Sequence, residues 1–457
     1  MKTTRVITLV AALVLQVGQG YAADAKRPNF VFFLTDDQPY LGMSCTGNPV
    51  LKTPHMDRLA TDGVLFEKAF VTTAICACSR ASVYTGQYMR RHGVEDFERP
   101  LSAAQWQQTF PALLRQAGYR TAFLGKYAIG SPKRGAEALP ADKFDLWYGF
   151  PQGIAFRQMV EGQPRYLTTV MTEKAVEFLK QTKSEQPFCL IMALKEPHGP
   201  LDFFDPDFKN EYANAKIPLP ANMTQQSFDA LPAAVRRGLN ADERGLRDPA
   251  HAAAQLRQIY GYISRADLAV GQVCAALKAQ GLDDNTVIIH LSDNGSFEGA
   301  HGLLGKWLMY EESIHVPLII RDPRLPAAAR GRRQQMALNI DVAPTILALA
   351  GVPAPAAMQG LDLQPVLRNP QAQGRADWYY EHTYTTPPSR RPIPKSEGVR
   401  TERWKYIRYT EPQPPLEQLF DLTADPREEK DLARDPAQAE TLARLRARCN
   451  QYRETLK

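Results

Sequence analysis

The sequence predicts an α/β fold: a large central, mostly parallel or mixed sheet sandwiched by helices, followed by a small antiparallel sheet with a closing helix. Two observations predict the main part. Four short apolar runs end abruptly in polar residues, as strands buried on both faces of a parallel sheet do. Between these runs lie stretches with the apolar spacing of helices. Such alternation is typical of a sheet with helices packed on both faces.

The four apolar runs place chemically useful side chains at strand ends. Ligands of open α/β sheets gather outside the carboxyl ends of the strands, so all four polar ends are expected to face one crevice. The runs and the polar residues that follow them are Asn29–Thr35 before Asp36-Asp37, Thr121–Leu124 before Gly125-Lys126, Phe188–Leu194 before Lys195-Glu196-Pro197-His198, and Val287–Leu291 before Ser292-Asp293-Asn294.

The helices are predicted from apolar periodicity and from glycine stops. A further helix over Ser79–Tyr88 would place residue 76 just ahead of its N-terminus, where backbone amides favour anions. The other predicted helices are Met56–Gly63, Thr109–Gly118, Met171–Lys180 and Leu256–Gly281.

The texture of the chain changes after about Gly360. Tyr384–Lys395 is rich in Pro, Arg and Thr, which marks a loop, whereas Gly398–Tyr409 and Gln418–Leu422 have the character of antiparallel strands. Ala437–Thr455 has helical spacing. We therefore expect a leader over residues 1–22, a main domain over 23–365 and a small subdomain over 366–457.

The first residues have the three parts of a secretory signal. Lys2 and Arg5 precede the apolar run Val6–Val17, and Gly20-Tyr21-Ala22 resembles a small-residue cleavage site. The run is too short to span a membrane. The sequence predicts an exported protein, periplasmic or secreted, that begins near Ala23 and has no membrane segment.

The charge and the cysteine content of the chain argue against two classes of protein, nucleic-acid binders and disulfide scaffolds. The chain has 55 Lys and Arg against 49 Asp and Glu, and loss of the leader lowers the net charge from +6 to +4. That bias is too weak to indicate nucleic acid, and no aromatic-and-basic motif supports it; it suits an anionic substrate. Six cysteines in 457 residues are too few for a disulfide scaffold.

One segment carries the most specific signal. Cys76-Ala77-Cys78-Ser79-Arg80, with Thr85-Gly86 beyond it, resembles the sulfatase signature, with Cys78 where proline or alanine is usual. The resemblance implies an alkaline-phosphatase-like fold. It also implies that a formylglycine-generating enzyme oxidises Cys76 to formylglycine, whose hydrate attacks sulfate esters beside Arg80.

Three further segments resemble sulfatase motifs and follow the order that these motifs have in that family. By resemblance, Lys126 and Lys306 bind sulfate, and His198, in a Pro-His-x-Pro element, is the general acid, a task that suits a group with a pKa near neutrality. Ala128 stands where the family has a histidine that helps to expel sulfate. His301 is our candidate for the missing base.

Two acidic groups predict a metal site. Asp36-Asp37 and Asp293-Asn294 put four oxygen donors on two strand ends, which suits a hard cation such as calcium. A lone acidic pair more often marks a turn or a helix cap. The family resemblance implies that these four residues bind calcium together with the residue formed from Cys76.

The sequence thus predicts a calcium-dependent sulfatase, a sulfuric ester hydrolase. Met309–Leu318 resembles the version common in carbohydrate sulfatases and favours a sulfated carbohydrate as substrate. Two alternatives stay open: a phosphodiester or phosphonate ester hydrolase of the same superfamily, and a sulfated-glycan binder without turnover, motivated by Cys78 and Ala128. Arg390, Arg391 and Lys395 either contact further anionic groups or form a solvated loop.

Overall fold

The computed structural model describes residues 26–131, 139–183, 185–200, 208 and 210–456. The predicted leader, residues 1–22, lies outside the described residues.

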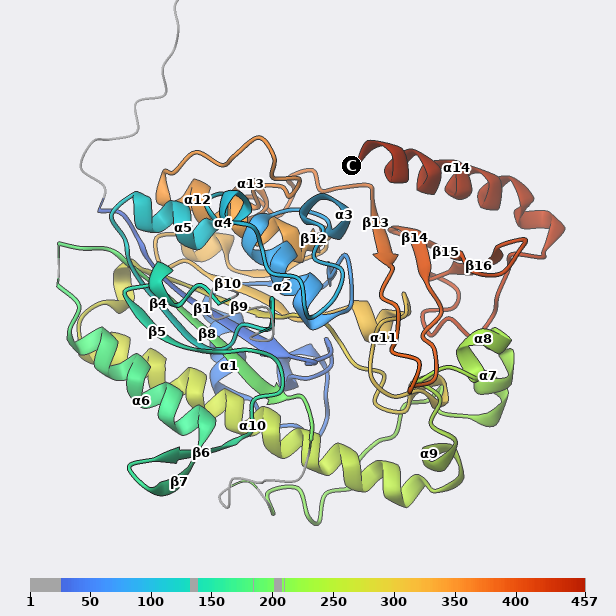
Figure 1. Cartoon of the computed structure of the whole chain (residues 1–457), viewed down its shortest axis with the longest axis horizontal. Coiled ribbons are helices and arrows are strands. Elements are labelled where there is room, and N and C mark those ends of the chain that lie inside the picture. Colours follow the sequence, from blue (N-terminus) through green and yellow to red (C-terminus); the bar gives the residue numbers. More distant parts are fainter. Residues whose placement is uncertain (1–25, 132–138, 184, 201–207, 209, 457) are drawn as a thin grey trace, which may run out of the picture.

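An eight-stranded sheet forms the centre of the molecule (Figure 1). Its strand order is β11-β2-β10-β9-β1-β8-β4-β5, and only β10 runs against the other strands. The mostly parallel sheet is therefore confirmed. The strands are β1 Asn29–Asp36, β2 Val64–Phe66, β4 Arg120–Lys126, β5 Leu146–Phe150, β8 Phe188–Pro197, β9 Thr286–Ser292, β10 Leu318–Arg321 and β11 Gly331–Arg333.

The central strands are buried on both faces because their side chains alternate between two cores. In β1, Phe30, Phe32 and Leu34 pack on one side, and Val31 and Phe33 pack on the other. The first core is shared with α2 Cys76–Thr85, α5 Phe110–Gln116 and α12 Val342–Ala350, and the second with α1 Pro54–Asp62, α6 Leu167–Lys180 and α10 Pro249–Ala279.

The remaining elements of the main part are short. Two small strand pairs are β3 Ala69–Phe70 with β12 Ala337–Leu338, and β6 Arg157–Val160 with β7 Gln163–Tyr166. The short helices are α3 Met89–His92, α4 Ala103–Trp106, α7 Gln225–Ala230, α8 Ala233–Arg236, α9 Glu243–Arg247, α11 Glu311–Ile314 and α13 Gln364–Arg368.

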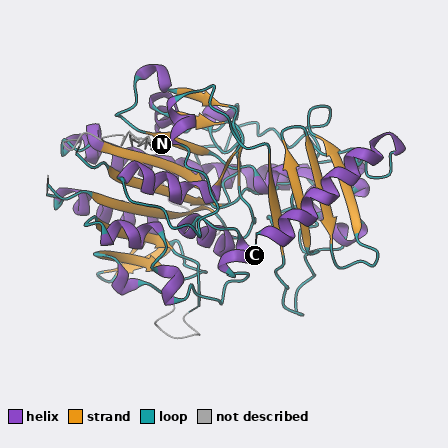
Figure 2. Cartoon of the chain, turned by 90° about the horizontal axis from the view of Figure 1, so that it is seen from above, coloured by secondary structure: helices purple, strands orange, loops and turns teal. Residues whose placement is uncertain are grey.

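A second sheet forms the C-terminal part (Figure 2). It is antiparallel in the order β13-β14-β15-β16, and α14 Ala439–Thr455 packs on it. This confirms the predicted antiparallel sheet with a closing helix. The strands are β13 Asp377–His382, β14 Ser396–Thr401, β15 Trp404–Tyr409 and β16 Leu416–Asp421.

Some predicted boundaries were wrong in detail. Gly398–Tyr409 is two strands rather than one, because the chain turns at Glu402 and Arg403. The helix that we expected from Ser79 begins at Cys76, so residue 76 is the first residue of α2 and does not precede it. In the described part of the chain, no helix combines the length and the apolar character needed to cross a membrane.

Candidate active site

The polar ends of four neighbouring strands meet at one edge of the large sheet. Because β9, β1, β8 and β4 are adjacent and parallel, their carboxyl ends point to the same side. Asp36 ends β1, Lys126 ends β4, His198 follows β8, and Asp293 follows β9. The structure brings these four residues together, as the sequence predicts.

Glycine allows the Lys126 strand end to form. Gly125 has φ of 105°, and a Cβ there would lie 2.1 Å from the Ala193 carbonyl oxygen of the adjacent strand. An alanine at this position would collide with backbone, so the chain can only place Lys126 here with glycine before it.

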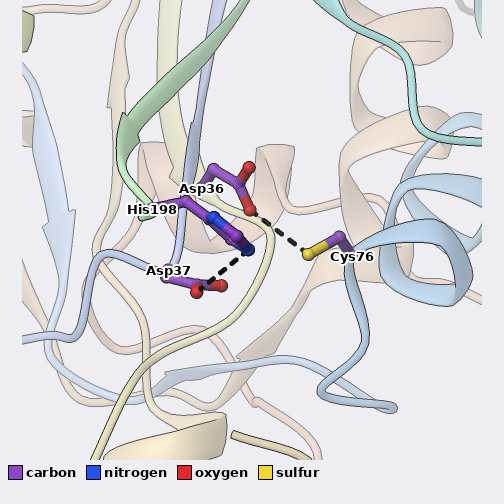
Figure 3. Close-up of side chains that lie close together, drawn as sticks. All are labelled: Asp36, Asp37, Cys76 and His198. Atoms are coloured by element: carbon purple, nitrogen blue, oxygen red, sulfur yellow. Dashed lines mark hydrogen bonds and ion pairs between the residues drawn. The ribbon is translucent and has the colours of Figure 1, made fainter. Parts of the chain in front are cut away.

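Cys76 lies opposite these strand ends, at the start of α2 (Figure 3). Its Sγ donates to Asp36 Oδ1 at 3.2 Å and accepts from Lys306 Nζ at 2.8 Å. Burial, and then Asp36, raise the pKa of the thiol to about 12. Every residue of α2 is buried, and the helix N-terminus has no side-chain cap. Its first amides therefore point toward the site as donors for an anion.

One ligand atom from each of Asp36, Asp37, Cys76 and His198 falls within 4.8 Å of the others. The side chains of these residues converge on one point (Figure 3). His198 Nε2 is 3.8 Å from Asp37 Oδ2. Burial lowers the pKa of His198, and the carboxylates of Asp36 and Asp37 oppose that shift.

Three buried cations surround the acidic residues. Arg80 Nε donates to Asp293 Oδ2 at 2.7 Å, and another of its nitrogens donates to the Lys126 carbonyl. Lys126 Nζ donates to Asp36, and Lys306 Nζ donates to Asp37. Burial alone would raise the pKa of Asp36, but these cations hold it well below its ordinary value.

The donor set fits a hard cation. Asp36, Asp37 and Asp293 supply carboxylate oxygens, and Asn294 Nδ2 donates to Asp37 Oδ1 at 2.6 Å. Asn294 Oδ1 is buried without a hydrogen-bond partner in the described part of the chain. An orphaned amide oxygen beside three carboxylates suits a hard cation such as calcium, which prefers oxygen ligands. The oxygens of Asp293 also accept hydrogen bonds from Arg80 Nε and from the Asp37 backbone amide.

Backbone strain is concentrated around the site. Seven described non-glycine residues have positive φ, and five of them lie in the loops that follow the central strands. Strained conformations of this kind persist where surrounding structure holds them, and they cluster at functional sites. The five are Asp37 (70°), Ala128 (63°), Glu298 (50°), His301 (54°) and Trp307 (81°).

His301, our candidate base, lies in a different cluster. Its Nε2 is 3.7 Å from Glu312 Oε1, and its ring lies 5.0 Å from the Tyr310 ring. Among the described residues, no hydrogen bond or ion pair joins it to Cys76. Ala128, which is fully buried, has only a methyl side chain and so cannot transfer a proton at the position where the family has histidine.

Two further residues near the site were not identified in the sequence analysis. Asn240 Nδ2 donates to the carbonyls of Leu304 and Lys306, both at 2.7 Å, and thereby positions Lys306. Glu298 lies in the loop between Asn294 and Lys306. The only sequence signal for Glu298 was its place between two motifs, and nothing in the pattern distinguished Asn240.

A helix N-terminus and three cationic side chains converge where a negatively charged group would bind. A candidate metal site and a histidine lie next to them. This combination is typical of an enzyme that hydrolyses anionic esters.

Comparisons with known proteins narrow that class. The sulfatase family model matches residues 28–352, and a model described as the N-sulphoglucosamine sulphohydrolase C-terminal region matches residues 299–455. This chain belongs to the sulfatase family, whose members hydrolyse sulfuric esters.

Relatives extend over most of the chain. An N-acetylglucosamine-6-O-sulfatase of Bacteroides thetaiotaomicron is 29% identical and covers 93% of this chain and 86% of its own length. A solved structure in complex with its substrate, D-glucosamine-2-N,6-O-disulfate, is 27% identical, with a TM-score of 0.81 and coverage of 94% and 98%. A phosphonate monoester hydrolase of Agrobacterium radiobacter, 23% identical with a TM-score of 0.78 over 94% and 96%, shares the fold.

Proposed function

We propose that this sulfatase cleaves sulfate esters on a sulfated carbohydrate, with a formylglycine made from Cys76 and with calcium. The observation that carries the proposal is the position of Cys76. It is the first residue of a buried, uncapped helix, and it contacts both Asp36 and Lys306. The formylglycine hydrate would supply the hydroxyl that attacks sulfur.

Asp36, Asp37, Asp293 and Asn294 would hold the calcium ion, because their oxygens converge and one of them is orphaned. When bound, calcium would supply positive charge beside the ester oxygens, where negative charge develops.

The chain's own cations bind the sulfate group. Lys126 and Lys306 each carry an ammonium at the carboxylate cluster, and Arg80 holds Asp293 and the Lys126 backbone in place. Their charge-assisted hydrogen bonds orient the ester in a site that water barely enters, because all three side chains are buried.

His198 is the proton donor for the leaving alcohol in this proposal. Its side chain is 36% exposed, whereas those of Asp36, Arg80 and Asp293 are fully buried. The leaving group therefore departs past His198, whose imidazolium form, favoured by the carboxylates of Asp36 and Asp37, can protonate it there. The role of His301 as a substitute base stays a prediction, because its side chain contacts Glu312 and Tyr310.

The carbohydrate part of the proposal is supported by relatives. One is named for N-acetylglucosamine 6-sulfate, and a structural neighbour was solved with a sulfated glucosamine. We therefore propose a 6-sulfated N-acetylhexosamine as the first substrate to assay. The proposal includes export to the periplasm or the medium through residues 1–22, and maturation by a formylglycine-generating enzyme.

Mass spectrometry of the purified protein tests the proposal. The tryptic peptide Ala69–Arg80, from a host with formylglycine-generating activity, should show the mass loss of thiol-to-aldehyde conversion at Cys76. Two intact thiols together with bound but uncleaved sulfated sugar would instead favour the binder. Faster cleavage of a phenyl phosphonate ester than of phenyl sulfate would favour the phosphonate alternative.

A variant provides the functional arm of this test. Cys76→Ala should abolish turnover and leave the melting temperature within a few degrees of wild type, since Ala fits a buried helix start. Full activity in the folded variant would contradict the mechanism.

A further inference from the structure

Glu298 occupies a strained position that its loop holds firmly. Its φ of 50° is unfavourable for a residue with a side chain. The backbone on either side is fixed, because Phe297 N–H donates to the Gly305 carbonyl at 2.8 Å and Gly299 N–H donates to the Leu303 carbonyl at 2.9 Å. The loop therefore holds the Glu298 side chain in place at the expense of backbone strain. Strain of this kind is typical of residues with a functional role.

The Glu298 carboxyl group lacks a partner. In the described part of the chain it has no hydrogen bond and no ion pair, although the side chain is half-buried. Burial, and then Asp37, raise its pKa to about 8. The Glu298 carboxyl group is thus partly removed from water without a hydrogen bond from the described residues in return.

The missing partner would come from the open side of the site. Asp37 and His198 have side chains 16% and 36% exposed, whereas the side chains behind them are inaccessible. Substrate enters on the Asp37 side, and the alcohol that His198 protonates remains there. Glu298 lies in the loop between Asn294 and Lys306, and both of these side chains donate hydrogen bonds to Asp37, so this loop borders the leaving-group side of the site.

We propose that Glu298 is a specificity-determining residue that hydrogen-bonds a hydroxyl or amide N–H of the sugar whose sulfate is removed. This inference rests on the proposed function. A carboxyl group accepts hydrogen bonds from such groups when ionised and can also donate one when protonated, so it serves in either state. A substrate without these groups leaves the half-buried carboxyl unpaired and is disfavoured for that reason.

The test compares two substrates in four proteins. Values of kcat/KM for N-acetylglucosamine 6-sulfate and for 4-nitrophenyl sulfate, which lacks sugar hydroxyls, are measured for wild type, Glu298→Gly, Glu298→Gln and the control Glu243→Gln. Glu243 is exposed on α9, where it pairs with Arg247. We expect Glu298→Gly to lower the sugar-to-aryl ratio about 100-fold, Glu298→Gln to retain most of it, and the control to match wild type.

The same variants also serve as a control for correct folding. Glycine suits a φ of 50°, so Glu298→Gly should melt at or above the wild-type temperature even as the ratio falls. Parallel losses on both substrates would show a structural role and overturn the inference. A tenfold weaker calcium affinity of Glu298→Gly, with an unchanged ratio, would make Glu298 a metal ligand and also overturn it.

The two proposals fail separately. Wild-type cleavage of the sugar sulfate with a ratio that Glu298→Gly does not change would leave the proposed function standing and remove the inference. If wild type cleaves neither ester, the proposed function fails. Calorimetric titration with N-acetylglucosamine 6-sulfate then decides the inference, and equal affinities of wild type and Glu298→Gly would contradict it.

Discussion

Arg80 is a fully buried guanidinium shared between two strand ends. It donates to the Asp293 carboxylate at 2.7 Å and to the Lys126 backbone, and its third nitrogen lies 3.9 Å from Asp36. Only the planar fork of arginine reaches separate acceptors at fixed angles, whereas lysine carries a single point charge. The position of Lys126 and the ionisation of Asp293 therefore depend on the shape of this side chain as well as on its charge.

Arg80→Lys is accordingly expected to be severe. The shorter ammonium leaves buried acceptors unpaired, so we expect a loss of about 3 kcal/mol in the free energy of unfolding and at least about a 100-fold loss in kcat/KM. Urea unfolding and sulfatase assays measure the two effects. The matched control is Arg58→Lys, at an exposed pair with Asp62, which should not differ measurably from wild type in either assay. Equal behaviour of the two variants would refute the role assigned to Arg80.

At the scale of elements, the C-terminal sheet supports the segment that carries Lys306. Lys405 of β15 is fully buried and pairs with Glu311 at 2.8 Å, at the start of α11, and with Glu428 at 2.7 Å. Arg400 of β14 pairs with Glu311 at 3.2 Å. Burial raises the pKa of Glu428, and the adjacent Lys405 ammonium opposes that shift and favours the ionised carboxylate. This ionic cluster fastens the second sheet to the loop after the active site.

The cluster predicts a non-additive pair of variants. Lys405→Met should cost about 3 kcal/mol, because it leaves two buried carboxylates without their shared cation. Adding Glu428→Gln removes one of those charges, while Glu311 keeps Arg400, so the double variant should recover about half of the loss. Urea unfolding of the four proteins in this cycle measures the coupling. Additive losses would show that Lys405 and Glu428 act independently.

How well the sequence predicted each element depended on how local its determinants are. Apolar runs stopped by Asp36, Lys126, His198 and Asn294 are local signals, so the strands and their common edge were predictable. The reversal of β10 was not, because Leu318–Arg321 is as apolar as a parallel strand and its direction depends on pairing with β9 and β2. Strand β13 was missed for a similar reason, since its pairing with β14 is what defines it.

The residues of the candidate site also differ in how well the sequence predicted them. Cys76, Arg80 and the acidic pairs belong to motifs, and the structure brings them within contact. Asn240 contacts carbonyls 64 and 66 residues away, and Glu298 lies between two motifs without belonging to either. Long-range contacts of this kind leave no periodicity or spacing in the sequence.

The molecule as a whole has a core that crosses the predicted boundary at residue 365. Trp378, Tyr380 and Leu419 of the C-terminal sheet belong to the same buried cluster as Phe32 of β1 and Val342 of α12. The boundary itself stays a prediction. Because the apolar contacts are continuous, we expect the two parts to unfold together, and the stability of the site is then the stability of the whole molecule.

The stability of the folded protein is expected to fall in acid because several of its histidines are buried. Four of them, His92, His290, His315 and His382, have a pKa lowered by burial, to between about 3 and about 4. His92 shows the physical cause. Its Nδ1 accepts from the Val94 amide at 3.1 Å and its Nε2 lies 3.0 Å from Ser82 Oγ on α2, so the ring fits only as the neutral tautomer.

The sign of the effect follows from proton binding. In the unfolded chain a histidine has a pKa of about 6.5, whereas folded His92 has a pKa of about 3, so between these values the unfolded state binds the extra proton. Stability from His92 is complete above about pH 6.5 and falls as the pH falls, by about 2 kcal/mol between pH 7 and pH 5. Urea unfolding at pH 7, 6 and 5 should show this loss, and His92→Gln should reduce it.

The exposed His55 on α1 is the matched control, and His55→Gln should keep the wild-type pH dependence. If His92→Gln also kept it, the buried ring would not be a source of the acid sensitivity, and the loss would have to come from the other buried histidines or from the carboxylates.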